Sequence, residues 1–367
     1  MGIYIRVNGR GSAWPLELAA HHSSDHRHAA LQGRPHEYAN TSLSILKVDD
    51  APSHAPVHWE VLFDIGQGIV PFLVQHGNRL PDAVILSHPH FDHVSGLDWL
   101  VQSYRRQTSA KAPLPVYTSK PCWETVARIF GYLVHSERLP GMLLRELRPG
   151  ESQDIPEAPG LQVTAFPVFH GDFAPGASLL LLEYAEAAHR KAVLTGDLLC
   201  PLLRHSDFER LRDADVLYVD AYSRFPWPRT NHWSFAAYDP RQGRETESTE
   251  LTAWRRDYPL TYLITPHTRA FERQTHRQYY RFFDDFLLEA LQDRSQLCWS
   301  IVEFAQRIQP QRIQLVHYGG HEDLRHYGQA ILNDEELLSW TQREALSYDL
   351  AAEAWSVPPP GDLLRLC

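Results

Sequence analysis

The stretch Ser87-His88-Pro89-His90-Phe91-Asp92-His93 gathers three histidines and one aspartate on one short segment. It follows an apolar run at 82–86, which indicates a buried strand, and precedes a pattern at 94–106 that indicates a helix. A loop between a strand and a helix lies at the carboxyl end of the strand, where open α/β folds commonly build their sites. Imidazole nitrogens and carboxylate oxygens bind zinc and similar cations. We therefore expect His88 and His90 to face one metal ion, and Asp92 and His93 to face a second one nearby.

Three further candidate ligands lie at the ends of other apolar runs. His170 follows the run at 161–169, Asp197 comes shortly after the run at 191–194, and His317 follows the run at 313–316. A single histidine at a strand end is more often structural than a ligand. Three such residues in order after the ligand loop favour one site on which all of them converge.

Apolar runs bounded by Gly, Pro, Asp or Asn indicate the strands of the fold. Strands are expected at residues 3–7, 42–48, 57–64, 82–86, 114–118, 161–169, 177–184, 191–194, 216–219 and 313–316. Helices are expected at residues 67–76, 94–106, 121–134, 301–308 and 333–352. This alternation suits an α/β protein with two sheets and helices outside, an αββα sandwich, although periodicity by itself also allows other α/β arrangements.

The chain of 367 residues is expected to form one core that carries an insertion. Residues 1–238 form the first part of the core, and residues 298–367 resume it with the last metal ligand and a C-terminal helix. The composition changes at 239–297, which we interpret as an insertion with a helix at 275–291. This insertion serves either as a lid, with His267 or Arg269 touching substrate, or as a packing or dimer contact through its aromatic run at 279–283. We favour packing or a homodimer contact.

Composition excludes several other classes of protein. With 43% hydrophobic and 22% charged residues, the chain matches soluble globular proteins rather than disordered ones. Its strongly apolar stretches, such as 178–184, are far shorter than the roughly 20 residues that span a bilayer. We expect no transmembrane helix and no membrane partner, and the N-terminal residues do not indicate a signal peptide.

Cysteine usage and net charge indicate the compartment and the kind of substrate. Cys122, Cys200, Cys298 and Cys367 form no CxxC pair, which argues against a disulfide framework and against a thiolate zinc site. We therefore expect a cytoplasmic protein. The formal net charge of −10 favours a small-molecule substrate over a long nucleic acid, because an acidic protein repels a polyanion.

Taken together, these motifs resemble the metallo-β-lactamase superfamily, and specifically its ribonuclease Z-like phosphodiesterase branch. The resemblance spans about residues 3–235 and 298–320, and it includes the motifs Gly9-Arg10-Gly11-Ser12-Ala13 and Asp64-Ile65-Gly66-Gln67-Gly68. It implies that His88, His90 and His170 hold one ion, that Asp92, His93 and His317 hold the other, and that Asp197 bridges them. Zinc is the expected metal, with manganese or iron as alternatives for a mixed histidine and carboxylate site.

The resemblance also implies residues that act beside the metals. In ribonuclease Z-like enzymes, a carboxylate soon after the bridging aspartate works with a histidine of a His-Ser-Thr motif on phosphate and leaving group. Asp220 takes the carboxylate position, where the family usually has glutamate, and His232 offers the histidine. The run 299–305 fits the helix after this motif equally well, which would put Trp299 in the histidine position. Asp92 is expected to orient the attacking hydroxide.

The expected function is a dinuclear metal-dependent hydrolase, a phosphodiesterase that cleaves a small or cyclic nucleotide or a related phosphodiester through metal-bound hydroxide. A lactone, carboxylic ester, sulfuric ester or β-lactam is an alternative substrate, because the same nucleophile attacks all of them. A further alternative is a metal-bound sensor or interaction module without turnover. Residues 107–160 show no basic arm comparable with that of tRNA-maturing members, which argues against tRNA processing.

Overall fold

A computed structural model of the chain describes residues 1–13, 39–49, 56–107, 113–134, 141–170, 174–184, 190–222, 232–233, 289, 292, 298, 300–318 and 334–367. The expected insertion at 239–297, apart from Glu289 and Gln292, lies outside the described residues, and so does Trp299. The division into core and insertion, the helix at 275–291 and the contacts of His267, Arg269 and 279–283 therefore stay predictions.

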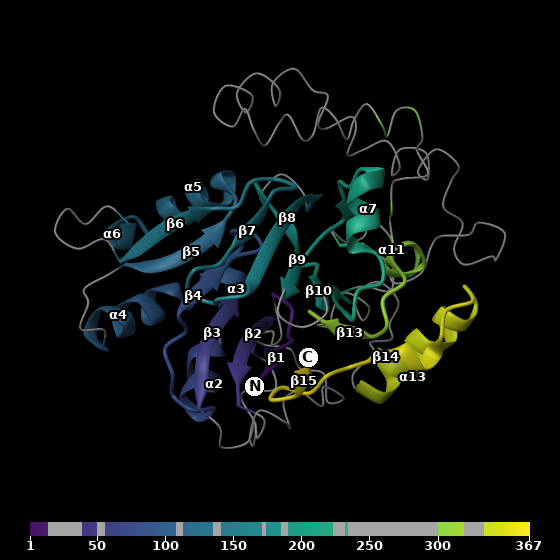
Figure 1. The fold of residues 1–367 in the computed structure, drawn as a ribbon, viewed down its shortest axis with the longest axis horizontal. Helices are drawn as coiled ribbons and strands as arrows, with labels where there is room; N and C mark the ends of the chain where they lie inside the picture. The colour runs from purple at the N-terminus through teal and green to yellow at the C-terminus, as the bar shows by residue number, and fades with distance from the viewer. Residues whose placement is uncertain are drawn as a thin grey trace, which may run out of the picture.

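Two β-sheets form the centre of the molecule (Figure 1). The first has the strand order β15-β1-β2-β3-β4-β5-β6, and the second has the order β11-β8-β9-β10-β12-β13-β14, with β7 paired to β8. The strands of the first sheet are β1 (Gly2–Gly9), β2 (Ser42–Val48), β3 (Val57–Phe63), β4 (Ala83–Ile85), β5 (Leu114–Thr118), β6 (Met142–Glu146) and β15 (Leu363–Arg365). Those of the second are β7 (Ser152–Asp154), β8 (Leu161–Phe169), β9 (Ser178–Tyr184), β10 (Arg190–Leu194), β11 (Cys200–Pro201), β12 (Val216–Asp220), β13 (Ile313–Val316) and β14 (Trp355–Ser356).

Helices cover the outer face of each sheet (Figure 1). The helices on the first sheet are α2 (Ile69–Gln75), α3 (Phe91–Val94), α4 (Leu97–Gln107), α5 (Lys120–Ile129) and α6 (Gly131–Val134). Those on the second are α7 (His205–Leu211), α11 (Ile301–Ile308) and α13 (Asp334–Leu346), which is followed by the 3₁₀ turn η4 (Ala352–Ala354). Among the described residues, no helix is long and apolar enough to cross a lipid bilayer.

Alternation of side chains along the central strands explains this layering. Successive residues of a strand point to opposite faces of the sheet, so a strand covered on both faces is apolar throughout. In β3, Val61 faces the cluster between the two sheets, whereas Leu62 faces the cluster under the helices. In β9, Leu180 faces the same central cluster, whereas Leu181 faces the cluster under the helices of the second sheet. The predicted αββα sandwich is therefore confirmed.

Some predicted helices are wrong in their extent. The helix expected at 94–106 is broken before α4 because the Gly96 N–H donates to the Ile65 carbonyl oxygen at 2.8 Å, which ties the chain to the end of β3. The helix expected at 121–134 is interrupted between α5 and α6. The one expected to run to residue 352 ends at Leu346, and the chain then turns through Asp349, which has a φ of 56° in the left-handed region.

Candidate metal centre

The candidate ligands follow strands whose carboxyl ends meet at one edge of the sandwich. In the second sheet, β8, β10, β12 and β13 all point in the same direction, since β10, β12 and β13 are mutually parallel and β8 is antiparallel to β9, as β10 is. His170, Asp197 and His317 come just after three of these strands. The loop 87–93 follows β4 of the first sheet. The candidate ligands thus converge from both sheets, as open α/β sites commonly do.

The structure brings the seven predicted ligands together in two groups. Within each group, one potential ligand atom per residue lies within 4.8 Å of those of the other members. The groups are His88, His90 and His170, and Asp92, His93, Asp197 and His317. This division matches the two halves that the sequence resemblance implies. That these residues bind metal stays a prediction.

Asp197 lies between the two groups. Its Oδ2 is 3.2 Å from His93 Nε2, 3.1 Å from His317 Nε2 and 3.8 Å from His88 Nε2. The same oxygen is 3.9 Å from His170 Nε2. A carboxylate among four imidazoles is well placed for a ligand shared by two cations.

The donor atoms of the cluster suit divalent cations. Among the described residues, the buried Asp197 Oδ1 makes no hydrogen bond, and a buried polar atom without a partner is costly. A bond to a metal ion would satisfy this oxygen. The cluster combines imidazole nitrogen with carboxylate oxygen and contains no described thiolate, a set that zinc, manganese and iron all accept.

Charge is divided unevenly over the histidines of the cluster. Burial lowers the pKa of His88 well below its ordinary value and that of His170 to about 3, so both rings are neutral. Burial alone would also lower the pKa of His93 and His317, but the surrounding carboxylates outweigh it. Asp197, Asp92 and Asp64 raise the pKa of His93 well above its ordinary value. Asp197 and Asp220 raise the pKa of His317 to about 10.

Asp64 holds two of the histidines from behind. Its Oδ2 accepts hydrogen bonds from His93 Nδ1 at 2.8 Å and from the Ser87 hydroxyl at 2.6 Å, while its Oδ1 accepts from the Ser87 N–H. The Ser87 hydroxyl oxygen in turn lies 2.9 Å from His88 Nδ1. These contacts direct Nε2 of His88 and of His93 toward Asp197. Carboxylates that orient metal-binding imidazoles in this way typically tune metal affinity.

Asp220 joins the cluster to His232. Its Oδ2 accepts from His232 Nδ1 at 2.5 Å, and its Oδ1 accepts from His317 Nδ1 at 3.2 Å. The His232 ring lies 4.9 Å from that of His170 and 5.2 Å from that of His317, and it stacks on Tyr222 at 4.2 Å. Of the two candidates for the histidine position, His232 is thus beside the cluster, while Trp299 lies outside the described residues.

A cavity of about 330 Å³ opens onto the cluster. Four candidate ligands and His232 line it. A substrate in the cavity would therefore reach both the candidate ligands and His232. Its lining consists of Ala13, Gln67, His90, Phe91, Asp92, His170, Asp197, Tyr222 and His232.

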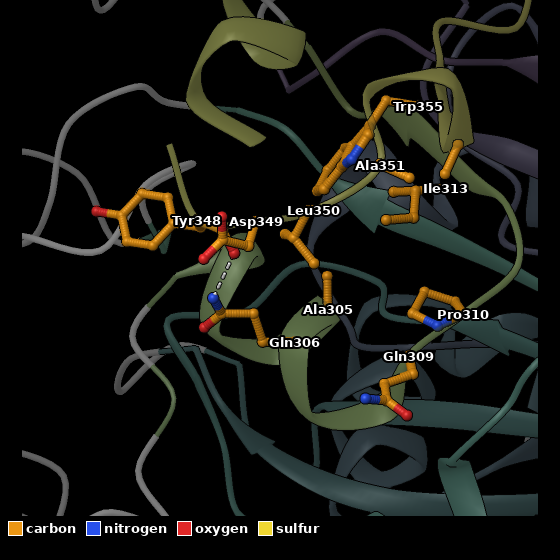
Figure 2. Close-up of a pocket in the computed structure, with 11 residues that line it drawn as sticks. Ala305, Gln306, Gln309, Pro310, Ile313, Tyr348, Asp349, Leu350, Ala351 and Trp355 are labelled. Carbon is orange, nitrogen blue, oxygen red and sulfur yellow. Dashed lines mark hydrogen bonds between the residues drawn. The ribbon is translucent and has the colours of Figure 1, made fainter. Parts of the chain in front are cut away.

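A larger cavity of about 540 Å³ lies elsewhere, between α11 and the segment 348–355 (Figure 2). Gln306 spans one side of it by donating to the Tyr348 carbonyl oxygen at 2.8 Å. Ile313, at the amino end of β13, lines this cavity, whereas His317 follows the carboxyl end of the same strand. No histidine or cysteine is among the residues described as lining it, so the smaller cavity is the candidate active site.

Three residues of the site were not singled out from the sequence: Ser87, Tyr222 and, in its positioning role, Asp64. Asp64 follows β3, which is parallel to β4, so its side chain emerges at the same edge as the ligand loop. A carboxylate at a strand end was thus a usable signal. Tyr222 gave no signal, because its stacking on His232 depends on the fold.

Comparison with known families agrees with this fold. A family model described as the Beta-lactamase superfamily domain matches residues 54–239, just over half of the chain. The chain therefore belongs to the beta-lactamase superfamily, which confirms the family expected from its motifs. No curated protein sequence gives a significant match.

Solved structures with the same fold include a diphosphatase, a Zn²⁺-bound protein and a tRNase. A diphosphatase from the PhnP family is 17% identical, covers 100% of this chain and 99% of its own, and gives a TM-score of 0.56. Zn²⁺-bound PqqB from Methylobacterium extorquens is 13% identical over 98% of this chain and 99% of its own, with a TM-score of 0.53. The short form of human tRNase Z is 13% identical over 99% of each chain, with a TM-score of 0.51. At these identities the likeness is one of fold.

Proposed function

We propose that this protein is a dinuclear metal-dependent hydrolase that cleaves a phosphodiester bond in a small substrate, such as a small or cyclic nucleotide. The observation that carries the proposal is the buried pair of His232 and Asp220 beside the seven candidate ligands, joined by a hydrogen bond of 2.5 Å. Such a pair suits a reaction in which a leaving oxygen needs a proton.

Two divalent cations held by the two groups of ligands would acidify water and take up the negative charge that develops on phosphoryl oxygen. We propose zinc, because imidazole and carboxylate ligands suit it and because the related PqqB structure is Zn²⁺-bound. Manganese and iron suit the same donors.

Asp92 is the proposed residue that orients the attacking water. Burial raises its pKa, but the nearby His93 and His317 outweigh this and hold the pKa below its ordinary value. The carboxylate therefore stays ionised at neutral pH. Because it also lines the cavity, it is available to accept a hydrogen bond from water beside the substrate.

His232 is the proposed acid for the leaving group. Asp220 holds its Nδ1, so Nε2 is the ring nitrogen that would deliver a proton to substrate. Stacking on Tyr222 at 4.2 Å, with the rings inclined by 19°, restricts rotation of the imidazole. A fixed ring lowers the entropy cost of aligning the proton with the departing oxygen.

Three further observations support phosphate chemistry on a small substrate. The names of two related structures, a diphosphatase and a tRNase, denote enzymes that cleave bonds to phosphorus. The cavity of about 330 Å³ matches a small molecule. The net charge of −10 argues against a long polyanion.

The test combines metal analysis with turnover, on the wild-type protein and on Asp197→Ala. We expect about two metal ions per chain and hydrolysis of bis(p-nitrophenyl) phosphate, with both reduced in the variant. Turnover of lactones or carboxylic esters without any phosphodiester turnover would move the function to the alternative substrates. Full metal content without turnover of either class would support a sensor, and absence of metal would overturn the site.

A further inference from the structure

Phe91 is an exposed aromatic residue in the ligand loop. Its side chain is 57% exposed, although the histidine two positions later is fully buried. Phe91 lies between the candidate ligands His90 and Asp92 and lines the same cavity as they do. The other exposed aromatic residues of the described ranges, Trp99 and Tyr132, do not line that cavity. A single exposed apolar side chain is ordinary on a protein surface, but one that lines a cavity beside candidate ligands is available to contact whatever binds there.

The position of Phe91 is fixed by the backbone around it. His90 precedes α3 in an extended conformation, and its carbonyl oxygen accepts from the His93 N–H at 3.0 Å. The Phe91 carbonyl oxygen accepts from the Ser95 N–H at 2.8 Å. A short turn held at both ends fixes the Cα of Phe91 relative to His90 and Asp92, which belong to the same turn. An aromatic side chain has only two rotatable bonds to fix, so it binds at a low entropy cost.

Three further uncharged residues line the cavity besides Phe91, namely Ala13, Gln67 and Tyr222. The remaining lining residues are His232 and the histidines and aspartates of the cluster. The cavity is therefore lined both by ionisable groups and by apolar and neutral groups. A substrate that carries an anionic group and an uncharged group would find partners for both in this lining.

We propose that Phe91 recognises a planar aromatic group of the substrate by stacking on it, while the metal centre holds the phosphoryl group. The inference rests on the proposed function, since the phosphoryl group is the anchor that brings the aromatic group to the ring. It narrows the substrate class to aryl or nucleobase-bearing phosphoesters. Aromatic pairs prefer offset or edge-to-face contact, and they contribute binding beyond the area that they bury.

The test uses two phosphonates that are not hydrolysed, phenylphosphonate and methylphosphonate, and measures their binding to metal-loaded protein by calorimetry. We expect the wild-type protein to bind phenylphosphonate about tenfold more tightly. Phe91→Ala and Phe91→Leu should both lose most of that preference and keep their metal content. Leucine keeps apolar area without a ring face, so it separates stacking from simple burial.

Trp99→Ala is the matched control, because it removes an equally exposed aromatic residue from α4 outside the cavity. It should keep the full preference for phenylphosphonate. Equal affinity of the wild-type protein for both phosphonates would overturn the inference about Phe91, and so would a preference that survives in Phe91→Leu. If either of these two results is found in a protein that turns over bis(p-nitrophenyl) phosphate, the proposed function stands and only the role of Phe91 is wrong. Binding of neither phosphonate, with no diester turnover, would overturn both.

Discussion

Asp64 connects histidines from both proposed metal groups. It accepts from His93 directly and reaches His88 through the Ser87 hydroxyl, and it is fully buried. Burial raises the pKa of Asp64, although its contacts with His93 and Ser87 act in the opposite direction. This carboxylate is therefore stabilised by the partners that it orients, and its removal should disturb both proposed metal ions.

We predict that Asp64→Asn lowers metal affinity about 10- to 100-fold, because the amide cannot accept from His93 and Ser87 as a carboxylate does. The measurement is competition with a chelator of known affinity. Asp154→Asn, which alters an exposed aspartate in β7, is the control and should change nothing. Unchanged affinity in Asp64→Asn would mean that backbone geometry alone fixes the ligands.

Substitutions of His232 and of Asp220 should differ in their effects on kcat and on metal affinity. His232→Ala should lower kcat about 10²- to 10⁴-fold with full metal content, because only the proton donor is lost. The loss should be larger for a diester with an alkoxide leaving group than for bis(p-nitrophenyl) phosphate, since p-nitrophenolate departs without a proton. Asp220→Asn should lower metal affinity as well, because Asp220 also holds His317. Equal losses of kcat for both leaving groups would argue against a proton donor.

At the scale of elements, Gly66 allows the ligand loop to lie against the end of β3. A Cβ on Gly66 would be 1.7 Å from the Asp92 carbonyl oxygen and 2.5 Å from Asn40 Cβ. Real Cβ atoms do not approach backbone so closely, so the loop carrying Asp92 would have to move. The motif 64–68 therefore matters both for the carboxylate of Asp64 and for the missing side chain of Gly66.

We predict that Gly66→Ala destabilises the protein by about 3 kcal/mol and lowers its metal content. Gly77→Ala is the control, because its Cβ would meet no described atom within 4 Å. Its φ of 105° still makes alanine unfavourable there, by about 1 to 2 kcal/mol. Denaturant unfolding and metal analysis distinguish the two variants, and full metal content in Gly66→Ala would contradict the prediction.

The buried strands were predictable because their apolar runs are long and clearly bounded. The strand at 42–48, the strand at 114–118 and the helix at 301–308 match the structure residue for residue. β6 was missed because its apolar run is only three residues long, and only its first residue is buried at the edge of the sheet. β15 was missed because its pairing with β1 joins residues that lie far apart in sequence. Local patterns carry no information about such a partner.

The candidate site was predictable for the same reason as the central strands. His170 and His317 directly follow strands, Asp197 lies shortly after one, and parallel strands bring their carboxyl ends to one edge. The choice between His232 and Trp299 was not predictable, because neither residue lies within a predicted strand or helix, and local patterns do not place residues outside such elements. The contacts of His232 with Asp220 and Tyr222 show that His232 lies beside the cluster. They give no information about Trp299.

At the scale of the whole molecule, the cluster joins the two sheets. The loop 87–93 comes from the first sheet, and His170, Asp197 and His317 come from the second. Bound cations would therefore act as cross-links between the layers as well as reactants. Each ion present at 100 times its Kd would add about 2.7 kcal/mol to the free energy of unfolding.

We predict that metal removal lowers Tm, and that this loss grows as pH rises from 6 to 9. In metal-free protein, the raised pKa values of His93 and His317 contribute stability that is full below about 6.5 and is lost as pH rises toward 10. Metal binding requires both rings to release those protons, so it strengthens over the same range. Thermal unfolding with and without a chelator measures the difference. Asp197→Ala should show little dependence on metal, and a difference that shrinks with rising pH would contradict the prediction.

The strands β14 and β15 lie close together in sequence but belong to different sheets, β14 beside β13 and β15 beside β1. A ribosome that adds about 5 to 20 residues per second completes β15 roughly 20 to 70 s after β1. Throughout that interval one edge of β1 has no strand to pair with. During synthesis the nascent chain therefore exposes a template for β-pairing, which is where we expect chaperone binding and, in its absence, aggregation to begin.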